Sequence, residues 1–186
     1  MKKTVLTFGL IAGGLLAAFL VGTMLLVKNI GFDKGEIVGY AGMVLAFLLV
    51  FFGIRSYREN VAGGTITFGR ALGVGLLIMV IASACYVIAW EIIYFNFIHN
   101  FADKYAAHMV EQVRNSGAGE AAIQAKLQQM KKFKELYENP FFNAAITFLE
   151  PLPVGFVMTL VSALILRKKR KAGASFPNAP ATQVAS

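Results

Sequence analysis

Two glutamates lie inside stretches of the sequence that are otherwise nearly free of charge. Glu91 follows the uncharged run 71–90, and Glu150 lies within the apolar segment 144–166. A carboxyl group in hydrocarbon is costly, and proteins retain it where it is partnered or has a function, such as binding a proton or a cation. Glu150 and Glu91 are therefore the candidate functional polar residues of this chain.

Glu150 is the stronger candidate because of its depth and of the prolines beside it. On a helix that ends at Leu166 it lies ~24 Å from the inner edge of the hydrocarbon, below the outer boundary. Pro151 and Pro153 each remove a backbone donor, so we expect a kinked helix with freed carbonyl groups. A broken helix beside a carboxyl group is typical of ion and substrate sites in transporters.

A structural role for both glutamates is the alternative. Glu150 could satisfy the broken backbone or bond to a side chain across the helix pair, for which the candidates are Tyr86, Trp90 and Asn143. Glu91 lies near the outer edge of the hydrocarbon, and the aromatic residues around it are typical of an interfacial belt. Glu91 is therefore interpreted most simply as an interface residue.

Other residue types that could support chemistry form no recognisable motif. His99 with Asp103 and His108 with Glu111 have helical spacing and could each give two ligands, but neither pair matches a metal-binding pattern. Cys85 is expected to be a small packed side chain. No nucleophile, dinucleotide or phosphate-loop signature occurs, so we expect no catalytic residue, no cofactor, no metal site and no enzymatic activity.

The elements that position these residues are four membrane spans. The chain of 186 residues is 57% hydrophobic and only 15% charged, which is too apolar for a soluble domain of this size. Runs of about twenty apolar residues are long enough to cross a bilayer as helices. The expected spans are about 5–27, 37–54, 71–95 and 144–166.

The charges flanking these spans indicate an orientation. Ten basic residues and one acid, Glu59, fall on the side that holds both termini and the loop 55–70, whereas the other side has eight basic and seven acidic residues. The positive-inside rule places the first side in the cytoplasm. The net charge of +8 is thereby explained by topology and anionic lipid, without nucleic-acid binding.

The segment 97–139 between the last two spans is polar but helical in pattern. Its apolar residues recur every three or four positions on either side of a turn that contains Gly117 and Gly119, either of which could cap a helix. Asn139-Pro140 is typical of the start of the next helix. We expect an all-α integral membrane protein in which the third span continues without a break into an upright extracytoplasmic helical hairpin; a hairpin lying on the membrane is the alternative.

Small residues spaced four apart predict close helix contacts in the spans. The rows begin at Gly9, Gly14, Gly69 and Gly155. The four-helix domain with its hairpin is expected to cover 1–171, and the small, proline-containing segment 172–186 to form a disordered cytoplasmic tail.

Several motifs together resemble a bacterial membrane family catalogued as domain of unknown function 4199. They are residues 52–58 (FGIRSYR), 64–70 (GTITFGR), 86–91 (YVIAWE), 139–143 (NPFFN) and 148–155 (FLEPLPVG). The resemblance covers about residues 1–171 and implies a multi-pass protein of the bacterial inner membrane. It brings no activity, cofactor or catalytic residue with it.

Two functional hypotheses follow. The first is a non-enzymatic structural or interaction component whose hairpin contacts a membrane-protein partner or a second copy of the chain. The second is a small proton- or cation-linked carrier that uses Glu150 beside the broken helix. Membrane lipid is a partner in both.

Overall fold

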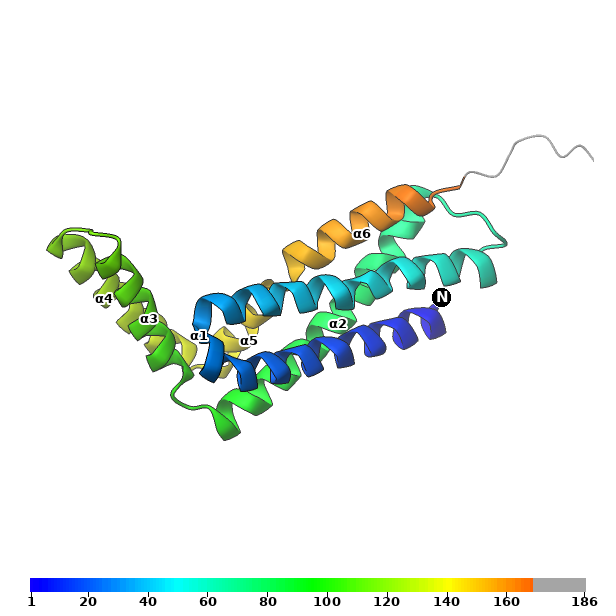
Figure 1. Cartoon of the computed structure of the whole chain (residues 1–186). Coiled ribbons are helices and arrows are strands. Elements are labelled where there is room, and N and C mark those ends of the chain that lie inside the picture. Colours follow the sequence, from blue (N-terminus) through cyan, green and yellow to red (C-terminus); the bar gives the residue numbers. More distant parts are fainter. Residues whose placement is uncertain (169–186) are drawn as a thin grey trace, which may run out of the picture.

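The computed structural model describes residues 1–168, apart from the side chains of residues 28–30, and the expected tail 172–186 lies outside this part of the chain. The described residues form six α-helices and no strand, which confirms the all-α class (Figure 1). The helices are α1 (Lys2–Asn60), α2 (Phe68–Phe97), α3 (Phe101–Asn115), α4 (Glu120–Tyr137), α5 (Pro140–Leu149) and α6 (Leu152–Leu166).

Four helical segments are long and apolar enough to cross a membrane, as expected, and all are longer than the apolar runs alone. They are Lys2–Val27, Gly31–Asn60, Phe68–Phe97 and Pro140–Leu166. The first two are the arms of α1, which reverses direction sharply at Gly31 (Figure 1). Gly31 has φ 80° and ψ 171°, a backbone conformation that residues with a Cβ atom rarely adopt. The second arm therefore begins six residues earlier than the expected 37.

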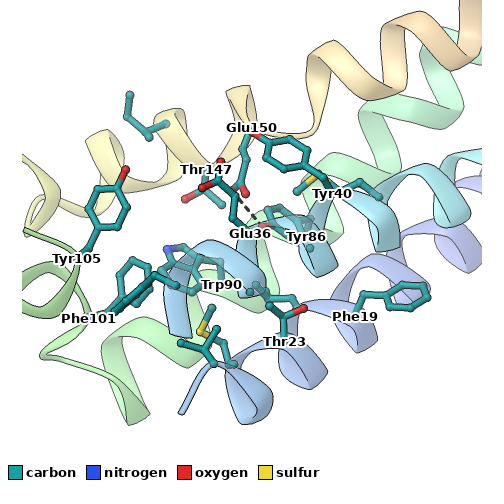
Figure 2. Close-up of a pocket in the computed structure, with 18 of the residues that line it drawn as sticks. Phe19, Thr23, Glu36, Tyr40, Tyr86, Trp90, Phe101, Tyr105, Thr147 and Glu150 are labelled. Atoms are coloured by element: carbon teal, nitrogen blue, oxygen red, sulfur yellow. Dashed lines mark hydrogen bonds between the residues drawn. The ribbon is translucent and has the colours of Figure 1, made fainter. Parts of the chain in front are cut away.

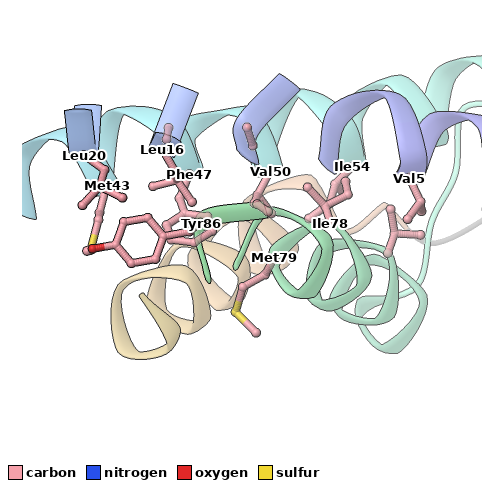
Figure 3. Packing of buried hydrophobic residues seen from close by; sticks show 14 of the residues in the cluster. Val5, Leu16, Leu20, Met43, Phe47, Val50, Ile54, Ile78, Met79 and Tyr86 are labelled. Carbon is pink, nitrogen blue, oxygen red and sulfur yellow. The ribbon is translucent and has the colours of Figure 1, made fainter. Parts of the chain in front are cut away.

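The core lies where the two arms of α1 pack against α2 and α6 (Figure 3). Phe47, Val50 and Ile54 of the second arm are fully buried, as is Ile78 of α2. Around this core the outer surface is apolar as well. Large hydrophobic side chains are exposed along every span, for example Leu25 (67%), Ile37 (70%), Ile88 (60%) and Ile165 (65%). An apolar exterior of this extent suits contact with lipid.

Two of the four small-residue rows bring helices into close contact. A Cβ added at Gly13 in the first arm would stand 2.5 Å from Cβ of Cys85 in α2, and one at Gly155 in α6 would stand 2.6 Å from Cγ of Met79. By contrast, a Cβ at Gly14 or Gly69 would meet nothing within 4 Å. The rows from Gly9 and Gly155 therefore pack inside the bundle, and the other two do not.

One end of the bundle gathers the N-terminus, the α1–α2 connection and the end of α6 (Figure 1). Arg58 donates a hydrogen bond to the carbonyl of Leu166 at 3.2 Å, and Ile66 and Lys168 exchange two backbone hydrogen bonds. The α1–α2 connection and the end of α6, which are expected on the same side of the membrane, are thus hydrogen-bonded to each other at one end of the bundle. The Gly31 turn and the α3–α4 hairpin lie at the other end.

The hairpin differs from the expectation of an unbroken third span. Instead of continuing to residue 101, α2 ends at Phe97, and α3 begins at Phe101 in a new direction. The rings of Trp90 and Phe101 are 4.9 Å apart, whereas eleven residues of straight helix would separate them by ~16 Å. The expectation was wrong because apolar periodicity continues through residues 98–100 although the backbone turns there, which lets the hairpin pack on the bundle.

Candidate functional site

The break between α5 and α6 places Glu150 on the inner side of the bundle. Asn139 caps α5 through its side chain, which accepts from the backbone N–H of Phe141 at 3.0 Å, as the Asn-Pro pair predicted. The helix ends at Leu149, and α6 starts at Leu152 after the first proline, which confirms the expected interruption. After the break, α6 packs against α1 and α2, whereas α5, which precedes the break, packs against α2 and α4. Glu150 lies at the joint.

A cavity of about 520 Å³ opens between these helices. Its wall is built from both arms of α1 and from α2, α3, α4 and α5, and Glu150 is part of it (Figure 2). The side chain of Glu150 lines this cavity and is exposed. The volume falls in the range of sites that hold small organic molecules.

The carboxyl group of Glu150 has one protein partner among the described residues. Tyr86 of α2 donates its hydroxyl to Oε2 of Glu150 at 3.0 Å. Tyr86 was one of the three partners considered for a structural role; the other two, Trp90 and Asn143, bond to each other instead. A tyrosine hydroxyl orients a carboxylate without neutralising its charge. The second carboxylate oxygen is therefore free to face the cavity.

A second carboxyl group lines the same cavity, from Glu36 in the second arm of α1 (Figure 2). The two carboxyl groups are close enough to interact electrostatically. Glu36 makes no hydrogen bond or ion pair with any side chain that the structure describes. Sequence reasoning missed it because Glu36 was counted among the loop charges before residue 37. Its spacing of four residues from Tyr40 could have indicated its position, because residues four apart share a helix face and Tyr40 also lines the cavity.

A buried polar network holds α5 against α2 beside the cavity. Asn143 is fully buried and accepts a hydrogen bond from Nε1 of Trp90 at 2.9 Å and another from the hydroxyl of Thr147 at 3.2 Å. Its amide nitrogen donates to the carbonyl of Tyr137 at 3.2 Å. Every polar atom of the Asn143 side chain is thus engaged, which fixes the wall that carries Glu150.

Aromatic rings dominate the rest of the wall. Phe101 and Tyr105 of α3 lie at one end of the cavity in Figure 2, and Tyr40 and Tyr86 lie nearer Glu150. Burial raises the pKa of Tyr105, and burial also raises the pKa of Tyr137. Both hydroxyls therefore stay neutral near pH 7, and Glu36 and Glu150 are the acidic groups of the described wall.

One polar side chain in the wall lacks a protein partner. Thr23 in the first arm of α1 is 7% exposed, and its hydroxyl makes no hydrogen bond to the described residues. Thr23 lines the cavity. An unpaired buried hydroxyl costs free energy unless something in the cavity satisfies it.

The Gly31 turn connects the bundle to the hairpin at the mouth of this cavity. Phe32 stacks on the ring of His108 at 5.2 Å and lies 6.1 Å from that of Phe101. Asp33 accepts hydrogen bonds from Nε2 of Gln112 at 2.8 Å and contacts Nε2 of His108 at 3.0 Å. These contacts hold α3 over the cavity.

Glu91 is not part of this site. It does not line the cavity, and one of its carboxylate oxygens is buried without a hydrogen-bond partner in the described part of the chain. Of the two candidate glutamates, the structure brings only Glu150 together with other polar groups of the cavity.

The histidine pairs also do not assemble as possible ligands. Asp103 pairs with Lys134 at 2.6 Å, and Glu111 pairs with Arg114 at 3.6 Å, so each acid has a partner other than its histidine. Within residues 1–168, no three His, Cys, Asp or Glu side chains come together as a group that could hold a metal ion.

Comparison with known proteins gives one match. A family described as "Protein of unknown function (DUF4199)" matches residues 7–168. No curated protein and no solved structure matches the chain.

Proposed function

Because this chain belongs to the DUF4199 family of unknown function, whose match over residues 7–168 includes the residues that line the cavity, we propose a role based on that cavity. The protein is a small proton- or cation-linked carrier of the membrane, and Glu150 is the group that takes up and releases the cation. The observation that carries this proposal is Glu150 itself, which lies at a helix break and on the wall of a cavity and which, among the described residues, only Tyr86 holds.

The position of the carboxyl group supports this role over a purely structural one. A glutamate that only stabilised the broken helix would be saturated by backbone or side-chain donors. Among the described residues, the Glu150 side chain bonds only to the hydroxyl of Tyr86 and makes no hydrogen bond to the backbone around the break. The carboxylate keeps capacity for a further partner, and a carboxylate that faces a cavity attracts a cation.

The proposal includes an orientation and a location. Both termini and the α1–α2 connection lie on the cytoplasmic side of a bacterial inner membrane, and the α3–α4 hairpin lies outside. The support is the excess of basic residues flanking the end of the bundle that holds Arg58 and Lys168. The cavity then lies near the outer face of the membrane, under the hairpin.

The test uses the purified protein reconstituted in vesicles that contain a pH-sensitive dye. A sodium or potassium gradient should change the internal pH faster than in protein-free vesicles, and Glu150→Gln should remove that difference. Glu91→Gln is the matched control, because it makes the same change in a glutamate outside the cavity, and it should keep the wild-type rate. A wild-type rate equal to that of empty vesicles, or an undiminished rate in Glu150→Gln, overturns the proposal.

A non-enzymatic interaction role for the hairpin is the second candidate. It draws on two leucines of α4 that remain exposed, Leu127 (42%) and Leu136 (41%). Replacing residues 100–138 with a short linker should leave membrane insertion intact and abolish crosslinks to neighbouring proteins or to a second copy. Crosslinks that survive the replacement argue against this role.

A further inference from the structure

The walls of the cavity indicate which class of cation it accepts. We propose that the cavity binds an amphipathic organic cation, whose charged group lies between the carboxylates of Glu36 and Glu150 and whose apolar part contacts the aromatic wall. The inference rests on the proposed cation-binding role of Glu150 and adds the chemical class of the ligand.

The charged side chains of the wall favour a cation. Glu36 and Glu150 bring two carboxyl groups to one cavity, and His108 is the only basic side chain among the described residues that line it. His108 is already engaged by Asp33 at the mouth. The described wall therefore holds two acidic groups and no free basic side chain, which favours a cationic occupant.

The aromatic and sulfur-containing side chains of the wall favour an organic cation. An inorganic ion requires a close shell of oxygen ligands, whereas this cavity places its two carboxylates among aromatic rings and methionine side chains. Tyr40 and Tyr86 lie next to the carboxylates, and Trp90 and Tyr105 continue the wall toward the hairpin (Figure 2). Aromatic faces attract organic cations and simultaneously cover their apolar groups.

The hydroxyl of Thr23 offers a further contact to an occupant. This side chain is more than nine-tenths buried, lines the cavity and has no partner in the described part of the chain. An occupant with a polar atom, or a water bound with it, would supply the missing hydrogen bond. The Thr23 hydroxyl is therefore a hydrogen-bonding position that an occupant of the cavity can fill.

Size separates the organic cation from a bare proton or metal ion. A space of about 520 Å³ is far larger than either needs and lies within the range of small-molecule sites. The wall is also asymmetric, because the carboxyl groups come from the second arm of α1 and from the joint between α5 and α6, while Phe19, Leu20 and Met24 of the first arm provide an apolar region. That division matches a ligand with one charged end and one apolar end.

The test measures binding of tetraphenylphosphonium to the full-length protein in nanodiscs of zwitterionic lipid. Trp90 is the only tryptophan of the chain and lies in the cavity wall, so quenching of its fluorescence reports occupancy directly. Tetraphenylborate, an anion of nearly the same shape, is the ligand control. We expect saturable quenching by the cation and none by the anion. Equal quenching by both, or none by the cation, overturns the inference.

Variants locate the site. Glu36→Gln and Glu150→Gln should each weaken binding at least tenfold, while Glu91→Gln should bind as the wild type does. Tyr40→Phe keeps an aromatic face and should bind normally, whereas Tyr40→Leu should weaken binding several-fold. Tyr40 is 41% exposed, so neither change disturbs the core. If Glu36→Gln binds the cation as the wild type does, or if the two Tyr40 variants bind it equally, the cation does not bind at the proposed site.

Failure of this inference is distinguishable from failure of the proposed function. If the vesicles show a Glu150-dependent pH change but the protein does not bind the organic cation, the carrier role stands and the proposed ligand class is wrong. If the protein binds the organic cation but the vesicles show no pH change, the binding site stands and the carrier role is wrong.

Discussion

The indole N–H of Trp90 in α2 donates to the side-chain oxygen of Asn143 in α5 at 2.9 Å, and both residues are buried. This bond joins the third span to the first half of the broken fourth span. It holds α5 in place at the point where the proline interruption removes regular helical hydrogen bonds.

We predict that Asn143→Ala destabilises the protein by at least about 2 kcal/mol, because the indole N–H of Trp90 and the carbonyl of Tyr137 lose their partner in a buried site. Thermal unfolding in detergent measures the loss. Asn96→Ala is the control, since Asn96 is exposed and bonds within its own helix. Equal unfolding temperatures for the two variants would contradict this prediction.

A second prediction concerns the contact between the first arm of α1 and α2. Gly13→Ala should destabilise the bundle by about 1–3 kcal/mol, because the new methyl group would stand 2.5 Å from Cβ of Cys85 and would push the helices apart. Gly14→Ala, at the next position, meets open space and should be neutral or slightly stabilising through helix propensity. Thermal unfolding of both variants in the same detergent tests the pair; the contact is refuted if Gly14→Ala is the less stable of the two.

The third prediction concerns the contact between the Gly31 turn and the hairpin. Phe32→Ala removes the ring that packs on Phe101, Tyr105 and His108, and aromatic pairs contribute about 0.5–1.5 kcal/mol each. Hydrogen exchange of the α3 amides should accelerate about tenfold or more, while α6 stays protected. Phe141→Ala serves as the control because this side chain is 88% exposed. Unchanged exchange in α3 would mean that the turn does not hold the hairpin.

The fourth prediction concerns orientation. In a Cys85→Ala background, a cysteine introduced by Ser116→Cys at the tip of the hairpin should react with a membrane-impermeant maleimide added to intact cells. A cysteine introduced by Asn60→Cys should react only after the cells are permeabilised. Both positions lie outside the core of the bundle and are exposed, so the difference reports the side of the membrane. The reverse pattern would invert the proposed topology.

Much of the fold was predictable from the sequence because membrane spans leave strong local signals. Long uncharged runs give the four spanning segments, the Asn139-Pro140 pair gives the start of α5, and the proline pair after Glu150 gives the break. Of the two glycines predicted as possible helix caps, Gly117 has the positive φ, 75°, and follows the end of α3. Each of these features depends on residues that are neighbours in the sequence.

The cavity was not predictable because it depends on residues that are far apart in the sequence. Glu36 appeared to be a loop charge, and only the reversal at Gly31 turns it toward Glu150 on the wall of one space. The turn at residues 98–100 was equally hidden, since apolar spacing continues through it. Periodicity reports which face of a helix is apolar, but it does not report where the backbone changes direction.

The interruption before α6 divides the fourth span into two parts with different neighbours. Helix α6 packs against α1 and α2, whereas α5 packs against α2 and is linked through α4 to the hairpin. Glu150 lies at the joint between the two parts. A tilt of the hairpin that moved α5 relative to α6 would therefore also change the surroundings of this carboxyl group.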